Sequence, residues 1–250
     1  IDMETASHRD IIELGKRISE EYNIKDFIGN KDKLVEIFSN FREMGGELDK
    51  KIWAKGSKKP NKERLMEVFK YYPKEWADML NESGRKLFAN SSKRGFFSNY
   101  LVDGRGRVKL DVEGAFDDYL TICLSDNSTV AYHEIGHLMD FLNPDFLRIE
   151  KEFVESRTKD ELETKLKDLF PGSGYGDKEI TKKDNFVDPY IGKTYKNATE
   201  VLSMGLEGLF MRTRYVQAII DNQFVMKSIQ DDEEFLNLII GLIARGWWNG

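Results

Sequence analysis

The sequence predicts an α+β protein that is mainly helical and carries one small β-sheet. Two patterns indicate this: apolar residues recur at helical spacing in several segments, and shorter β-branched or aromatic runs alternate with Gly and Asp between residues 100 and 124. The 250 residues are 40% hydrophobic and 12% aromatic, which is enough apolar side chain for a sizeable core. A chain that is disordered throughout is therefore excluded.

Residues 1–90 are predicted to form a helical subdomain, and residues 91–250 a second domain. Amphipathic helices are expected at 5–22 and 34–41, and a third from Asn61 until Pro73 interrupts it.

Three strands are expected next, at 100–102, 107–112 and 119–124, with an Asp-Gly turn at 103–106 joining the first two. A helix at 130–142 should follow, after the polar run 125–129 and before Asn143 and Pro144. The remaining segments are then predicted in order: charged helix at 144–170, a long polar loop at 171–197, and helices at 199–214 and 232–244.

The predicted helix 130–142 carries an HExxH arrangement, in which His133 and His137 flank Glu134. Histidines four residues apart share one helical face and can reach one zinc ion. With three histidines in 250 residues, only about three such matches per thousand chains arise by chance. The apolar residues of the helix lie on its opposite face, so the pattern favours a zinc site over two ordinary histidines.

The third zinc ligand is predicted to be Glu200. A catalytic zinc usually has three protein ligands and leaves the fourth position to water. No further histidine follows His137, so the remaining ligand must be acidic or come from elsewhere. Glu200 begins the predicted helix 199–214, where Ser203 and Glu207 share its face. Such a short polar stripe could also face solvent, and Glu207 is the alternative ligand.

Charge and length exclude several other classes of protein. The formal net charge is -6 and the pI about 5.4, which argues against general nucleic-acid binding. The most apolar late stretch, 235–244, is too short to span a bilayer, so no membrane partner is expected. Cys123 is the single cysteine, so no intramolecular disulfide is expected. The start at Ile1, without a signal-peptide pattern, suggests a piece of a longer polypeptide and leaves the localisation open.

HExxH on one helix and a glutamate on a later helix resemble the gluzincin metallopeptidases. Asp140, three residues after His137, is similar to the corresponding residue of the anthrax lethal-factor-like branch. The segments 72–76, 190–193 and 198–205 also resemble a zincin-like domain of prophage head-associated and toxin-like proteins. The resemblance covers roughly residues 65–244.

The resemblance implies a zincin-like fold, in which a small sheet lies above the HExxH helix and the glutamate helix lies beneath it. One zinc ion per chain and a protein or peptide substrate are implied as well. The strand at 119–124 would be the edge strand that pairs with an extended peptide. Tyr119, Thr121 and Cys123 are accordingly the expected substrate-binding residues, with burial as the competing role.

The implied activity is peptide-bond hydrolysis by a zinc-activated water, with Glu134 as general base and then acid. The oxyanion needs a further donor, for which Tyr195 is the first choice and Tyr190 the second. Asp140, Ser203 or Glu207 could orient a ligand histidine through its other ring nitrogen.

Three hypotheses follow for the function. The first is a zinc-dependent metalloendopeptidase of gluzincin type. The second is a virion- or toxin-associated interaction or structural module that keeps the fold without turnover, and the third is a zinc hydrolase of a non-peptide amide or ester. A purely structural zinc site has no need of a general base, so Glu134 favours catalysis over the second hypothesis.

Overall fold

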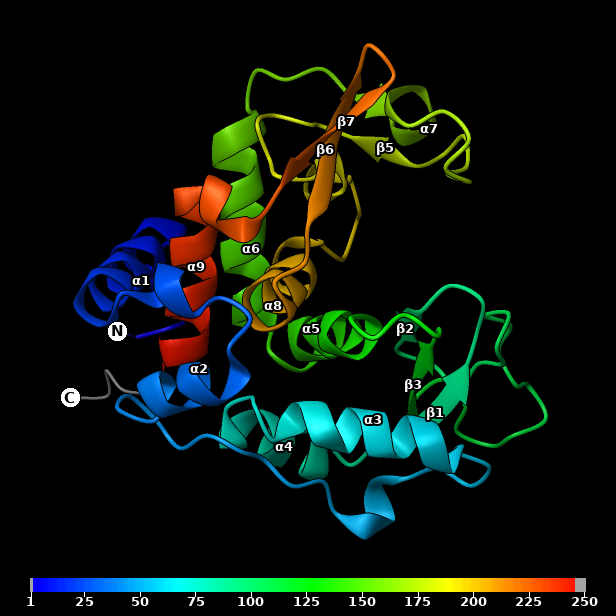
Figure 1. Cartoon of the computed structure of the whole chain (residues 1–250). Helices are drawn as coiled ribbons and strands as arrows, with labels where there is room; N and C mark the ends of the chain where they lie inside the picture. The colour runs from blue at the N-terminus through cyan, green and yellow to red at the C-terminus, as the bar shows by residue number, and fades with distance from the viewer. Residues whose placement is uncertain (1, 246–250) are drawn as a thin grey trace.

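The first and last helices of the chain lie side by side in the computed structural model, which describes residues 2–245 (Figure 1). They are α1 (His8–Tyr22) and α9 (Glu233–Ala244). A Cβ atom on Gly15 would lie 1.7 Å from the Asn237 carbonyl oxygen, and one on Gly241 would lie 2.1 Å from that of Ile11. Only glycine at these positions therefore lets the two backbones approach so closely.

The N-terminal part confirms the expected helices and adds one that the pattern did not separate. The helix expected from Asn61 ends at Phe69, before Pro73, and Pro73 is the N-cap of the next helix. The elements between α1 and the sheet are η1 (Ile24–Phe27), α2 (Lys31–Phe38), η2 (Lys50–Ile52), α3 (Lys59–Phe69) and α4 (Lys74–Asn81).

The sheet contains β1 (Lys86–Ser91), β2 (Phe96–Ser98) and β3 (Tyr119–Leu124) in the order β1-β3-β2. β3 is parallel to β1 and antiparallel to β2. The strand predicted at 119–124 is confirmed, but its expected position at the edge is wrong. β3 is the central strand, because its backbone pairs on both sides, and β1 and β2 are the two outer strands.

The strands expected at 100–102 and 107–112 are wrong. This segment is irregular apart from a single bridge between Val102 and Val108, closed by a turn in which the Gly106 amide donates to the Asp103 carbonyl. Its apolar residues form a small second core and do not pair in the sheet. The buried members of that core are Ala54, Phe88, Leu101 and Ala115. Alternating apolar residues can bury their side chains in a small core or in a sheet, so the pattern alone did not distinguish these two structures.

The C-terminal part confirms the helix at 130–142 with the expected ends, and the helices expected at 199–214 and 232–244 with shifted ends. Its elements are α5 (Val130–Leu142), α6 (Pro144–Thr158), β4 (Thr164–Lys165), α7 (Leu166–Leu169), β5 (Ile180–Thr181), η3 (Pro189–Gly192), α8 (Val201–Met211), β6 (Tyr215–Ile220), β7 (Gln223–Lys227) and η4 (Ile229–Asp231). The expected helix 144–170 is interrupted after Thr158, and β4 pairs with β5.

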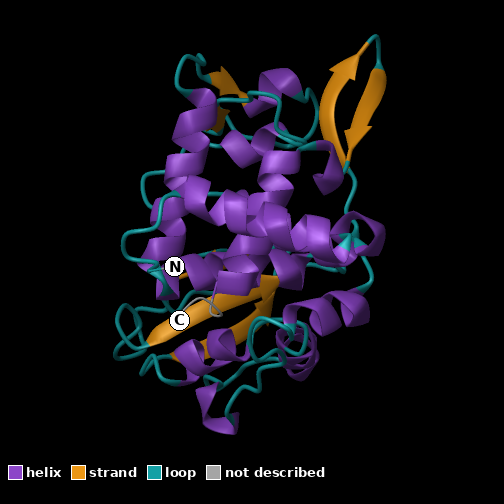
Figure 2. Cartoon of the chain, turned by 90° about the vertical axis from the view of Figure 1, so that its left-hand side faces the viewer, coloured by secondary structure: helices purple, strands orange, loops and turns teal. Residues whose placement is uncertain are grey.

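Sequence reasoning missed the hairpin β6–β7, which stands apart from the helices (Figure 2). Its two-residue turn is Asp221–Asn222, with φ angles of 50° and 60°. Asp and Asn tolerate positive φ, and a two-residue turn of this kind between apolar runs is a hairpin signal. That signal was present in the sequence and could have identified the hairpin.

The mainly helical α+β class is confirmed: helix makes up 46% of the described residues and strand 15%. The division at residue 90 stays a prediction; that position falls within β1, and one hydrophobic core includes Ile11 and Leu65 as well as Leu138 and Ile239. Among the described residues, no helix has the length and apolar character needed to cross a membrane.

Replacing Gly15 with Ala should destabilise the fold. Alanine in a helix interior normally stabilises it by about 1 kcal/mol, but here the added methyl meets the backbone of α9. We expect the free energy of unfolding to fall by about 1–3 kcal/mol, measured by urea denaturation. Glu13→Ala, on the exposed side of the same helix, is the matched control. Equal or higher stability of Gly15→Ala would show that α1 and α9 do not approach this closely.

Candidate metal centre

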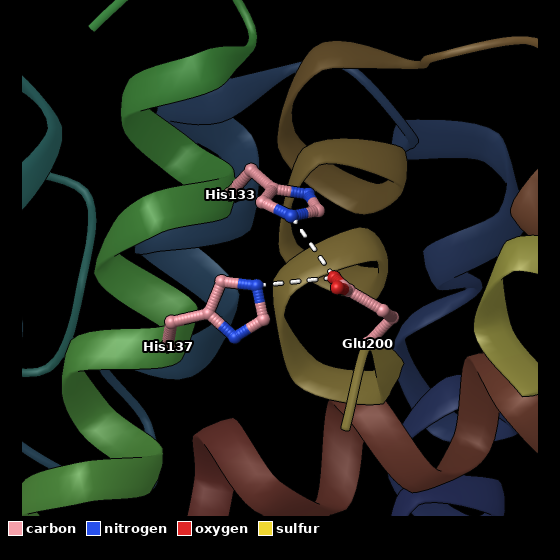
Figure 3. Close-up of side chains that lie close together, drawn as sticks. All are labelled: His133, His137 and Glu200. Atoms are coloured by element: carbon pink, nitrogen blue, oxygen red, sulfur yellow. Dashed lines mark ion pairs between the residues drawn. The ribbon is translucent and has the colours of Figure 1, made fainter. Parts of the chain in front are cut away.

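α5 presents His133 and His137 toward the start of α8 (Figure 3). The two side chains come from successive turns and are 14% and 15% exposed. Their rings are arranged edge to face, with centroids 5.0 Å apart and an interplanar angle of 72°. The shared helical face predicted from their spacing is therefore present.

Glu200 faces both histidines from the N-cap position of α8 (Figure 3). Its Oε2 atom lies 3.1 Å from Nε2 of His133 and 3.0 Å from Nε2 of His137. An N-cap side chain usually accepts a hydrogen bond from a backbone amide of its own helix, but that of Glu200 accepts none. Its carboxylate is instead directed at α5, so the structure brings together the three residues proposed as ligands.

The three donors fit a divalent metal ion. Nε2 of each histidine and a carboxylate oxygen of Glu200 all lie within 4.8 Å of one another. Ligands at bonds of about 2.0–2.1 Å around a tetrahedral ion are roughly 3.3 Å apart. The 3.0 and 3.1 Å separations from Glu200 to the histidines are close to that distance. Two imidazole nitrogens and one carboxylate oxygen form a donor set that suits several first-row divalent ions.

The charges in the centre are mutually compensated. Burial raises the pKa of the Glu200 carboxyl, but His137 and His133 outweigh it and hold that pKa well below its usual value. Burial lowers the pKa of each histidine, but the Glu200 carboxylate outweighs burial and raises both. Glu200 is therefore ionised at neutral pH, as a metal ligand must be.

Glu134 lies between the two histidines on α5 and is only 4% exposed. Its Oε2 atom is buried and has no hydrogen-bond partner among the described residues. Burial raises the pKa of this carboxyl above its usual value. An unpartnered carboxylate beside a metal site can accept a proton from a small molecule bound there.

The three donors and Glu134 open into one cavity of about 590 Å³. One of its walls is segment 93–97, which leads into the edge strand β2, and another contains Asp188, Tyr190 and Tyr195. A cavity of this size, lined by polar groups and a few aromatic rings, can admit part of an extended chain.

Tyr195 contacts the carboxylate of Glu200 directly. Its hydroxyl donates a hydrogen bond of 2.6 Å to Oε1, the oxygen that does not face the histidines. Tyr190 lies one step further out, with its hydroxyl 3.4 Å from that of Tyr195 and within 3.3 Å of a guanidinium nitrogen of Arg94. Burial and the Glu200 charge raise the pKa of both tyrosines, so both keep their protons and remain donors.

The three residues expected to orient a ligand histidine contact three different groups. Glu207 faces His133, with Oε1 3.7 Å from Nδ1. Ser203 instead donates its hydroxyl hydrogen to Oε2 of Glu200, at 3.0 Å. Asp140 is buried without a hydrogen bond to either histidine, because its carboxyl faces Glu150 on α6. Burial and this second carboxyl raise the pKa of Asp140 well above its usual value.

Glu150 caps the helix that carries Glu200. Its Oε1 atom accepts hydrogen bonds from the Leu202 amide at 2.7 Å and from the Thr199 hydroxyl at 2.8 Å. The Leu202 amide is one of the backbone groups that a helix N-terminus leaves unsatisfied, and Glu200, as the N-cap residue, does not serve it. Sequence reasoning missed Glu150, because a glutamate in a charged helix carries no signal of a partner fifty residues away.

Gly136, inside the HExxH motif, sets the distance between the two ligand-bearing helices. A Cβ atom at this position would lie 2.5 Å from the Cα atom of Ser203 and 2.8 Å from its nitrogen. The backbones of α5 and α8 can therefore meet only because residue 136 has no side chain. A glycine inside a helical pattern costs about 1 kcal/mol relative to alanine. A glycine at this costly position was the sign in the sequence that residue 136 makes a close contact.

The expected substrate contacts on β3 are wrong. Thr121 and Cys123 are fully buried, and the backbones of both pair with β1 on one side and β2 on the other. Tyr119 packs against the small second core. Burial raises the pKa of the Cys123 thiol to about 12, so it behaves as a core residue.

Comparison with known proteins gives no match: no protein-family model, no curated protein and no solved structure matches this chain. The resemblance to gluzincin peptidases therefore stays a prediction. The fold and the site define a mainly helical α+β protein with a His-His-Glu group that could hold a metal ion.

Replacing Glu150 with Leu should weaken metal binding, because the start of α8 then loses its cap and Glu200 loses its fixed position. We expect zinc affinity to fall by roughly 10–100-fold, measured by competition with a chromophoric chelator. Glu150→Gln is the matched control, because its side-chain carbonyl can still accept both hydrogen bonds. Undiminished zinc affinity in a folded Glu150→Leu protein would exclude this positioning role.

Proposed function

We propose that the chain is a zinc-dependent metalloendopeptidase. One observation carries this proposal: Oε2 of Glu134, a buried carboxylate oxygen with no hydrogen-bond partner among the described residues, lies beside a three-donor centre in an open cavity. A structural zinc site is closed by four protein ligands and needs no such group, whereas a catalytic site has three ligands and a base.

The chain supplies two groups to the proposed reaction besides the ligands. Zinc, when bound by His133, His137 and Glu200, supplies Lewis acidity for polarising a carbonyl and activating water. Glu134 accepts the proton of the attacking water and returns it to the leaving amide nitrogen. Its raised pKa, caused by burial, brings the carboxyl closer to the proton affinity that both steps require.

Tyr195 is the proposed donor to the oxygen that becomes negatively charged during attack. Its hydroxyl keeps its proton, lines the cavity and is already held next to the centre by its hydrogen bond to Glu200. Donation to substrate requires this hydrogen bond to be exchanged. The hydroxyl oxygen of Tyr190 is 3.4 Å from that of Tyr195 and can keep the Tyr195 hydroxyl in place during the exchange.

The edge strand β2 is the proposed site of substrate alignment, in place of 119–124. The order β1-β3-β2 leaves the outer backbone groups of Phe96–Ser98 unpaired among the described residues. Phe96 and Phe97 also line the cavity that holds the three donors. An extended peptide can add to such an edge through main-chain hydrogen bonds, which places its backbone across the centre.

The first test compares Glu134→Gln with the wild type on unfolded casein as a general substrate. Loss of the base should lower kcat/KM by about 10²–10⁴-fold, while elemental analysis still finds one zinc per chain. Glu200→Ala is the companion variant and should lose zinc to a mild chelator. Cleavage by Glu134→Gln at the wild-type rate would overturn the assignment of the base. A zinc-loaded wild type that cleaves no protein or peptide would favour an interaction module.

The second test concerns Tyr195. Tyr195→Phe keeps the ring and removes only the donor, so kcat should fall by roughly 10²-fold with KM little changed. Zinc affinity, measured in parallel, distinguishes donation to the substrate from a role in which Tyr195 only holds Glu200 in place. Normal kcat at saturating zinc together with weaker zinc binding would reduce Tyr195 to a positioning residue.

A further inference from the structure

The hairpin β6–β7 exposes large apolar side chains. Ile219, Ile220 and Phe224 are 36%, 59% and 67% exposed, although side chains of this kind are normally buried. They lie near the tip of the hairpin, which stands away from the helices (Figures 1 and 2). Clustered apolar exposure of this kind marks a binding surface more often than isolated exposed residues do.

A β-bulge in β6 allows apolar side chains of the hairpin to line one groove. The register shifts between Val216 and Ala218, so that one extra residue is inserted into β6. Residues three apart normally point to opposite faces of a strand, but the insertion lets Val216 and Ile219 line the same groove. Phe224, the cross-strand partner of Ile219, lines it too. Ile220 does not line the groove.

This groove, with a volume of about 520 Å³, lies between the hairpin and segment 170–175. Its apolar walls include Phe170, Pro171 and the three hairpin residues Val216, Ile219 and Phe224. The volume is within the range of about 300–1,000 Å³ that is typical of pockets for ligands.

The groove and the metal cavity adjoin each other. Both are lined by Tyr175, Asp188, Met204 and Glu207. Glu207 in turn faces Nδ1 of the ligand His133. A chain that lies across the metal centre from the edge of β2 therefore passes the mouth of the groove.

We propose that this groove binds a large apolar side chain of the peptide substrate, close to the bond that is cut. The inference rests on the proposed endopeptidase function and adds to it a substrate class: extended peptides with Leu, Ile, Phe or Met near the scissile bond. The lining that the groove shares with the metal cavity favours this occupant over a second copy of the chain, which would need no connection to the metal centre. Burying a side chain of this size contributes enough transfer free energy to determine specificity.

The first experiment uses zinc-loaded wild type on a library of tryptic peptides from whole-cell protein, read by mass spectrometry. Large apolar residues should be enriched at one fixed position within three residues of the cut. Absence of any cleavage would overturn the proposed function and this inference together. Cleavage without apolar enrichment would overturn the inference alone.

The second experiment compares Ile219→Ser and Phe224→Ser with Ile220→Ser on one peptide chosen from that library. The two groove variants should lower kcat/KM by about tenfold, mainly through a higher KM, and should weaken the apolar preference. Ile220→Ser is the matched control, because it removes an exposed isoleucine of the same hairpin outside the groove. Equal kinetics for all three variants would overturn the inference.

Binding without turnover provides an independent readout. In the zinc-loaded Glu134→Gln background, fluorescence anisotropy of the same labelled peptide should show about tenfold weaker binding for Phe224→Ser and none of this loss for Ile220→Ser. Analytical ultracentrifugation of the same proteins tests the other occupant. A change of oligomeric state in Phe224→Ser with unchanged peptide affinity would assign the groove to a second copy of the chain and overturn the inference.

Discussion

The contact between one carboxylate oxygen of Glu200 and the two histidines is the constraint on which the rest of the site depends. Oε2 of Glu200 lies 3.0–3.1 Å from both Nε2 atoms, so α5 and α8 must meet at a fixed distance and rotation. Gly136 permits that approach, because any side chain there would meet the backbone of Ser203. A displacement of either helix by one ångström would remove the shared donor geometry that a metal ion requires.

Burying so many ionisable groups in one place is costly unless each has a partner. Glu200 is compensated by the histidines, and further hydrogen bonds from Tyr195 and Ser203 hold its two oxygens. Glu150 takes over the capping of α8 that Glu200 does not provide. The surrounding polar network thus fixes the one carboxylate that both ligand-bearing helices share. Among the described residues that line the cavity, Glu134 has a buried oxygen, Oε2, without a hydrogen-bond partner.

The sheet determines the direction from which a chain could reach the centre. β3 is enclosed between β1 and β2, and of these three strands only β2 lines the cavity with an outer edge that no described strand pairs. The hairpin β6–β7 lines the adjoining groove, where apolar side chains replace much of the polar lining. In our proposal, backbone recognition by β2 and side-chain recognition by the hairpin groove act on the same extended substrate.

Local periodicity determined the helices, the class of fold and the face shared by His133 and His137, because helical spacing places residues i and i+4 together whatever the rest of the chain does. The same spacing placed Ser203 and Glu207 on the face of Glu200, and these three residues do lie next to α5. Strand order, the role of Glu150 and the close approach at Gly136 depend on which distant segments pack together. Apolar runs such as 107–112 can satisfy their burial in a small core or in a sheet, and no local pattern separates these outcomes. The sequence alone thus determined the candidate ligands, and only the tertiary structure decided what surrounds them, because those contacts join residues far apart along the chain.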